Sequence, residues 1–270
     1  MQTHNVNCST NEVNKNRPLV SFLILLIILL LPPAQATFAA APWRAEIDTA
    51  KSGFLQELGE MQIGFTYVVP PAMIRQSHTA KQTDSGYEWT LSGVELSAWQ
   101  TLQAPPEARY LLNWHFEYEG RIVEGRGRTG FIFGNTDNAN LLSVEMTRTG
   151  SLRLLIWGNA ERGREGRIAW SRQVRRGKNT DEPVRIEADY DIRQDTLTCR
   201  VDGGEPIHIV LGEYMPSGPM TIKGVGFFAA VPEAQIMTRV GRDPLPPEYE
   251  IELSSKRTRV AHRRLAVSAQ

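Results

Sequence analysis

Residues 128–157 read RTGFIFGNTDNANLLSVEMTRTGSLRLLIW, and they contain three strand-length segments separated by residues typical of turns. In the second segment Leu142, Val144 and Met146 alternate with the polar Ser143 and Glu145. Alternation with a period of two is typical of a strand that has one buried face and one exposed face. The polar run at 135–140 and the Thr-Gly-Ser turn at 149–151 supply the connections between the strands. This stretch therefore predicts a β-sandwich.

The same strand pattern recurs along most of the chain. Further strand candidates lie at 87–91, 94–99, 110–118, 184–190, 197–201, 207–211, 225–230 and 235–240. The one helical pattern, at 54–61, is weakened by Gly59. Strands at this frequency without intervening helices favour an all-β sandwich or barrel over a parallel sheet.

Five segments carry a resemblance to a known superfamily. They are YLLNWHFEY at 110–118, GFIFGN at 130–135, GSLRL at 150–154, DTLTCRVDG at 195–203 and GVGFFA at 224–229. In this order they resemble the strands of the concanavalin A-like lectins and glucanases, a superfamily that includes laminin-G-like modules. The resemblance implies a two-sheet antiparallel jelly-roll β-sandwich over residues 87–243 that binds carbohydrate or, in some members, hydrolyses it. The shared residues are core and turn residues, so the resemblance indicates fold more strongly than function.

The ends of the chain predict export and a few added elements. Lys15 and Arg17 precede an apolar run at 19–31, and Ala34-Gln35-Ala36 offers a cleavage site, so residues 1–36 have the pattern of a signal peptide. We expect a periplasmic or extracellular protein without a transmembrane domain after cleavage; a retained anchor is the alternative. Residues 37–86 are expected to add strands and loops that pack on the sandwich. Residues 244–270 are expected to form a basic tail or a late strand.

Charge and cysteine content exclude some classes of function. The chain has 30 Lys and Arg residues against 30 Asp and Glu residues, which argues against nucleic-acid binding. Beyond the predicted signal peptide Cys199 is the only cysteine, so no internal disulfide is expected. Because Cys199 shares a strand face with Leu197 and Val201, we predict a buried, unreactive thiol.

Trp157 is the first candidate for ligand binding. It shares a strand face with Arg153, and an exposed indole beside a guanidinium suits stacking against a sugar ring. Burial of that face under a second layer is an equal alternative. Trp170 is the next aromatic candidate. Arg128 extends a basic segment at 161–178 that could hold an anionic glycan, although a solvated hairpin explains the same charges.

His115 and Glu117 are candidates of a different kind. They alternate with Trp114, Phe116 and Tyr118, so they are predicted to face outward from their strand. Together with Glu145 and His208 they offer the acids and histidines of the pocket that a faint resemblance to bacterial keto-glycoside hydrolase modules implies; simple exposure is the favoured alternative. The Glu-x-Asp-x-x-Glu pattern that the resemblance implies for glucanases is incomplete, because the third carboxylate is missing after Glu46-Ile47-Asp48. The other candidate places Glu187, Asp189 and Asp191 on one strand face but has no Glu at the required end, and a solvated face is the favoured interpretation.

Calcium is the one cofactor that the pattern leaves open. Asn135 and Asp137 supply oxygen ligands at the 135–140 turn, although a turn stabilised by side-chain hydrogen bonds to its own backbone is the favoured explanation. Taken together, the patterns predict an exported, non-catalytic, carbohydrate-binding β-sandwich. The alternatives are a secreted glycoside hydrolase and a structural or adhesive module of the cell envelope.

Overall fold

The structure, a computed structural model, describes residues 41–51, 53–65, 76–93, 95–136, 140–160, 163–175, 182–215, 218–232 and 256–270. Within them the chain is built almost entirely from strands, with short 3₁₀ helices η1 (Phe54–Gln56), η3 (Pro106–Tyr110) and η4 (Leu211–Glu213) between them. Among these residues no helix is long and apolar enough to cross a membrane. The predicted signal peptide lies outside the described residues, and of the predicted helix at 54–61 only η1 forms.

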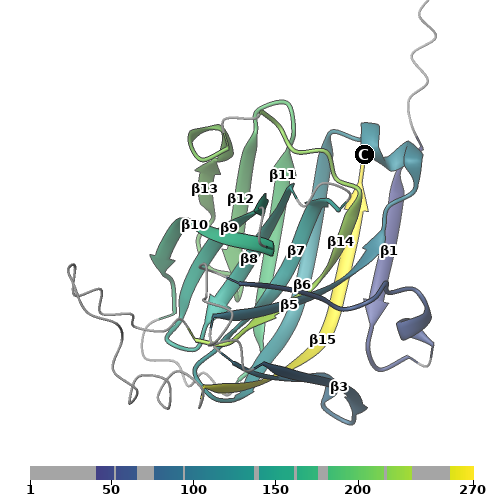
Figure 1. The fold of residues 1–270 in the computed structure, drawn as a ribbon. Helices are drawn as coiled ribbons and strands as arrows, with labels where there is room; N and C mark the ends of the chain where they lie inside the picture. The colour runs from purple at the N-terminus through teal and green to yellow at the C-terminus, as the bar shows by residue number, and fades with distance from the viewer. Residues whose placement is uncertain are drawn as a thin grey trace, which may run out of the picture. The chain divides into compact units, whose positions relative to one another are not determined.

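Two sheets face each other, here called sheet A and sheet B (Figure 1). Sheet A contains β1 (Trp43–Asp48), β3 (Ser77–Thr83), β4 (Gly86–Ser92), β6 (Asn113–Glu124), β11 (Val184–Asp191), β12 (Thr196–Val201), β13 (Ile207–Val210) and β15 (Arg257–Ala269). Its order is β13-β12-β11-β6-β15-β4-β3, and β1 pairs with the second half of β15.

Sheet B contains β2 (Gln62–Phe65), β5 (Leu96–Gln103), β7 (Arg128–Asn135), β8 (Asn140–Thr147), β9 (Ser151–Ala160), β10 (Gly163–Gln173) and β14 (Gly224–Ala230). Its order is β10-β2-β5-β14-β7-β8-β9, and β10 closes it by pairing with β9 and, at one position, with β2. The chain passes repeatedly from one sheet to the other, as in a jelly roll. The predicted all-β, two-sheet antiparallel jelly-roll sandwich is confirmed.

Aromatic side chains fill the space between the sheets. Phe116 of β6 stacks against Phe131 and Phe133 of β7, with ring centroids 5.2 and 4.7 Å apart. Trp114 and Tyr118, which share a face with Phe116, are also buried. Cys199 lies in the same core, and burial raises the pKa of its thiol to about 12. The outward direction of His115 and Glu117 follows from this alternation along β6.

The core also contains a histidine. His262 of β15 is fully buried, its ring stacks on Phe227 at 4.7 Å, and its Nδ1 lies 3.0 Å from the hydroxyl of Tyr118. Its Nε2 has no hydrogen-bond partner within the described part of the chain. Burial lowers the pKa of His262 to about 3, because the imidazolium would lose its hydration there. The ring is therefore neutral at physiological pH.

The outer face of sheet B is buried as well, which corrects the predicted pattern of β8. Ser143 and Glu145 are fully buried, although their alternation with apolar residues predicted an exposed face. A second hydrophobic cluster covers this side of the sheet; it comprises Trp99, Ile132, Leu141, Leu155, Trp157, Phe228 and Ala230. Period two correctly separates the two faces of β8, but both faces are packed.

The C-terminal strand lies inside sheet A. Residues 257–269 form β15, which pairs with β6, β4 and β1. The predicted domain boundary at residue 243 is therefore misplaced, because β15 belongs to the sandwich. Residues 244–270 were expected to form a basic tail or a late strand, and residues 257–269 form the strand. Residues 244–255 lie outside the described residues. In the N-terminal region β1, β2 and β3 pair with strands of both sheets.

Candidate functional site

The outer face of sheet A carries two adjoining hollows, which together we call the sheet A groove. The larger has a volume of about 730 Å³, and its lining includes His115, Asp189, Thr198 and His208. The smaller, of about 520 Å³, is lined by residues that include Glu46, Glu117 and Arg264. Arg44, His115 and Ser268 line both hollows, so the two hollows lie side by side.

His115 lies at the centre of the groove between two carboxylates. Its Nδ1 is 2.7 Å from Oδ1 of Asp189, which lies opposite it on β11, and its Nε2 is 3.4 Å from Oε1 of Glu117. Partial burial disfavours the imidazolium, but the hydrogen bonds and negative charges of Asp189 and Glu117 outweigh that effect. The pKa of His115 is therefore raised above its ordinary value.

A second histidine lies three strands away from His115, with β11 and β12 between them. Nδ1 of His208 on β13 is 3.0 Å from Oγ1 of Thr198 on β12. Thr198 is in turn the register partner of Asp189 on β11. The groove thus offers hydroxyl, imidazole and carboxylate groups on neighbouring strands, all pointing away from the core.

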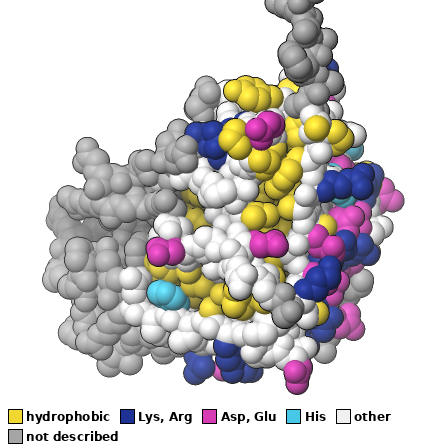
Figure 2. All heavy atoms as spheres, turned by 90° about the vertical axis from the view of Figure 1, so that its right-hand side faces the viewer, with side chains coloured by type: hydrophobic (Ala, Val, Ile, Leu, Met, Phe, Trp, Pro, Cys, Tyr) yellow, Lys and Arg dark blue, Asp and Glu magenta, His cyan; other side chains and the backbone are white. Residues whose placement is uncertain are grey.

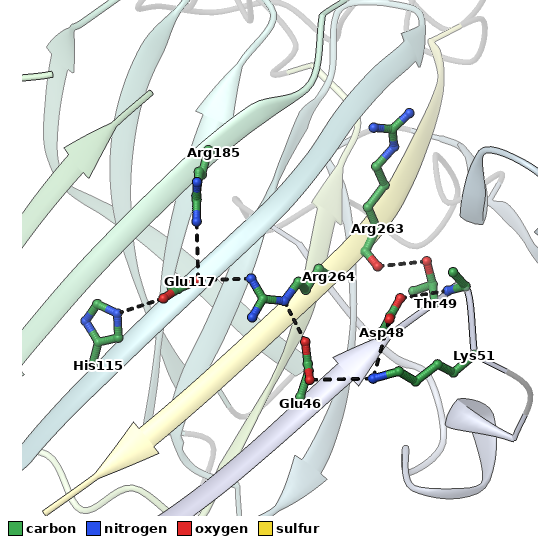
Figure 3. A network of polar contacts seen from close by, with 10 residues as sticks. Glu46, Asp48, Thr49, Lys51, His115, Glu117, Arg185, Arg263 and Arg264 are labelled. Atoms are coloured by element: carbon green, nitrogen blue, oxygen red, sulfur yellow. Dashed lines mark hydrogen bonds and ion pairs between the residues drawn. The ribbon is translucent and has the colours of Figure 1, made fainter. Parts of the chain in front are cut away.

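Ion pairs connect the side chains around the smaller hollow (Figure 3). Glu117 faces Glu187 directly across the β6–β11 pair, an arrangement that is unfavourable without a cation nearby. Arg264 supplies one, 3.0 Å from Glu117 and 2.7 Å from Glu46, and Arg185 lies 3.5 Å from both Glu117 and Glu187. Figure 2 shows Lys and Arg side chains interleaved with Asp and Glu side chains at the right-hand margin of its view.

These contacts also shift ionisation equilibria. Partial burial disfavours ionised Glu117, but His115, Arg264 and Arg185 outweigh it and hold its pKa below the ordinary value. The hydrogen bond from Arg264, together with the charge of Lys51, lowers the pKa of Glu46. The groove therefore keeps these carboxylates ionised at neutral pH.

The expectation that Trp157 is an exposed stacking platform is wrong. Its side chain is fully buried in the second hydrophobic cluster, beside Trp99 and Phe228. Its indole N–H donates a 2.9 Å hydrogen bond to the hydroxyl of Ser143. Trp157 is a core residue of the outer side of sheet B.

The other predicted residues of sheet B do not join the groove either. Arg128 is buried, and its Nη1 lies 3.3 Å from Oε1 of Glu145, which is also buried. Arg128 therefore does not extend a basic surface, and Glu145 does not belong to a pocket with the histidines. Arg153 pairs in register with Glu145 on the same outer side of sheet B. Trp170 is partly buried and packs on the core between the sheets.

The predicted calcium ligands are placed only in part. Asn135 ends β7, where it pairs in register with Asn140, and Asp137 lies outside the described residues. Within the described residues no group of three or more His, Cys, Asp or Glu side chains could hold a metal ion. Calcium at this turn stays a prediction.

The predicted anionic-glycan segment at 161–178 is also described only in part. Arg175 is buried, and its Nε lies 2.7 Å from Oδ2 of Asp202, so this side chain has a structural partner.

Of the predicted site residues, the structure therefore brings together His115 and Glu117, with His208 nearby. Thr198, Ser268 and Arg44 were missed as site residues, and Asp189 was weighed only as a glucanase carboxylate. The polar face of β11 gave a signal for Asp189, because Glu187, Asp189 and Asp191 alternate with apolar residues. Only strand pairing could place that face beside His115.

Neither models of protein families nor curated proteins match this chain. Solved structures do resemble it. A Crh5 transglycosylase in complex with NAG has 14% identity and a TM-score of 0.48, with 83% of each chain covered. A basic winged bean lectin with Tn-antigen has 10% identity and a TM-score of 0.46, with 85% of this chain and 98% of that chain covered.

The carbohydrate recognition domain of Emp46p, in its metal-free form, has 9% identity and a TM-score of 0.42, with 73% of this chain and 88% of that chain covered. At such identities the likeness concerns the fold alone. By its own sheet topology the chain belongs to the class of antiparallel jelly-roll sandwiches.

Proposed function

We propose that this is an exported protein that binds carbohydrate non-catalytically in the sheet A groove. The observation that carries the proposal is an open groove lined by closely spaced hydrogen-bonding side chains: the imidazole of His208, the hydroxyl of Thr198 and the carboxylate of Asp189, which His115 orients. A sugar presents hydroxyl groups that donate and accept at similar spacing, so it can pair with such a surface. Export rests on the pattern of residues 1–36.

The surroundings of His115 favour binding over catalysis. Both ring nitrogens face carboxylates, and these carboxylates stabilise the protonated ring. A general base needs a free nitrogen within reach of the substrate. His115 instead orients Asp189 and Glu117, whose remaining oxygens can accept hydrogen bonds from sugar hydroxyls.

A glycan array with neutral, uronic-acid and sulfated glycans tests the proposal. We expect saturable binding that falls at least tenfold in Asp189→Ala and Thr198→Ala. His78→Ala is the matched surface control, because His78 is exposed on β3 outside the groove. Failure of every glycan to bind, or equal binding by the groove variants, would contradict the proposal.

Glycoside cleavage in the same groove is a second candidate, favoured by the raised pKa of His115 between two carboxylates. A protonated imidazole can donate a proton to a leaving oxygen. Incubation with any glycan that binds, followed by measurement of new reducing ends, separates the two candidates. Turnover that disappears in His115→Gln while binding persists would favour the enzyme.

A further inference from the structure

One row of polar side chains crosses sheet A at right angles to its strands. The residues are register partners in sequence: His208, Thr198, Asp189, His115, Ser268 and Arg44, one each from β13, β12, β11, β6, β15 and β1. All six line the larger hollow. We call them the cross-strand row.

The length of the cross-strand row sets the size of ligand that it fits. Six strands have five spacings of about 4.8 Å each, so the row is about 24 Å long. A single sugar contacts side chains on two or three neighbouring strands at most. Because one residue from each of the six strands lines the same hollow, an elongated ligand can contact all six positions.

We infer that the sheet A groove binds an extended, uncharged oligosaccharide chain that lies across the strands along the cross-strand row. This inference rests on the proposed function and deepens it by naming the ligand class. The two ends of the row, His208 and Arg44, contact different sugar units of one chain, and His115 and Asp189 contact a central unit.

The charge of the groove argues for an uncharged chain. Its lining has four carboxylates, from Glu46, Glu117, Asp189 and Asp191, against two guanidinium groups, from Arg44 and Arg264. Arg264 is already paired with Glu46 and Glu117. A uronic-acid or sulfated polymer would bring further negative charge beside ionised carboxylates, which is unfavourable.

Length series test the inference. Isothermal titration calorimetry of the protein with glucose to cellohexaose, xylose to xylohexaose, and N-acetylglucosamine to its hexamer measures affinity against chain length. For the series that binds, we expect Kd to fall at least tenfold from the monosaccharide to the hexamer. Equal Kd for monosaccharide and hexamer would overturn the inference while leaving carbohydrate binding intact.

Variants along the row locate the chain. His208→Ala and Arg44→Ala should weaken hexamer binding at least threefold more than they weaken disaccharide binding, whereas His115→Ala should weaken both to a similar extent. His78→Ala, outside the row, should change neither. Unchanged hexamer binding in both end variants, or tighter binding of a sulfated polymer than of the neutral hexamer, overturns the inference. Binding of no glycan at all overturns the proposed function together with it.

Discussion

Acid should destabilise this protein through His262, a residue far from the groove. The unfolded chain has a histidine of ordinary pKa, near 6.5, whereas burial lowers the pKa of His262 to about 3 in the folded protein. Below pH 6.5 the unfolded chain therefore binds a proton that the folded chain does not, and the free energy of unfolding falls until the pH approaches 3. Between pH 7 and pH 5 the two pKa values give a loss of about 2 kcal/mol from this one group.

His262→Asn isolates the contribution. Asparagine can place a polar atom near the position of Nδ1, within reach of the Tyr118 hydroxyl, but it has no group that titrates near neutral pH. The variant loses the stacking on Phe227 and is therefore less stable at every pH. The other titratable groups are the same in both proteins. The difference between the two proteins in how the free energy of unfolding depends on pH therefore isolates His262.

Urea denaturation followed by tryptophan fluorescence at pH 7, 6 and 5 supplies the measurement. The free energy of unfolding should fall between pH 7 and pH 5 by about 2 kcal/mol more in the wild-type protein than in His262→Asn. Parallel pH profiles for the two proteins would refute the reasoning, because they would mean that folded His262 binds its proton as readily as the unfolded chain does.

Three further outcomes follow from particular contacts. Asp189→Asn should lower the pKa of His115, followed by NMR titration of its ring protons, because the hydrogen bond and charge of Asp189 help to raise it; an unchanged pKa would contradict the assigned contact. Gly226→Ala should lower the free energy of unfolding by about 1–3 kcal/mol in urea denaturation, since a Cβ there would overlap the Gln100 carbonyl oxygen. Gly158→Ala is the control and should change the free energy of unfolding little, because a Cβ there would meet open space. Trp157→Phe should lower the free energy of unfolding by about 1–3 kcal/mol, because the Ser143 hydroxyl loses the buried indole N–H that donates to it. The folded variant should bind glycans as the wild-type protein does; reduced binding by a fully folded variant would return Trp157 to the site.

The strand pattern predicted the architecture because each strand reports its own buried face. In β6 the apolar Trp114, Phe116 and Tyr118 identify the core side directly, and the structure agrees. Alternation cannot show whether the second face of a strand is exposed to solvent, since that depends on what packs against it. Leu155 and Trp157 on the presumed wet face of β9 were a signal that both faces are covered, as in strands buried on both sides.

The candidate site was predictable only strand by strand. Period two placed His115 outward on β6 and Asp189 outward on β11, but 74 residues separate them in the chain. Their contact depends on the register of the β6–β11 pair, and a shift by one residue would bring a buried neighbour opposite instead. Ser268 and Arg44 join through β15 and β1, the last and first strands, which neither motif nor spacing connects.

The different use of the two outer faces supports the choice of sheet A as the binding surface. A two-sheet sandwich uses one face of each sheet for its core, and the other face of each is available for a second role. Sheet B packs a second hydrophobic cluster around Trp99, Trp157 and Phe228 on its outer face, so ligand binding there would require removal of that packing. Sheet A keeps its outer face polar and hollowed, with Glu46 and Glu117 ionised and held in place by ion pairs across four strands. Recognition of a polar ligand on sheet A therefore requires no rearrangement of the core, and variants in the groove should change binding without changing the stability that the two hydrophobic clusters provide.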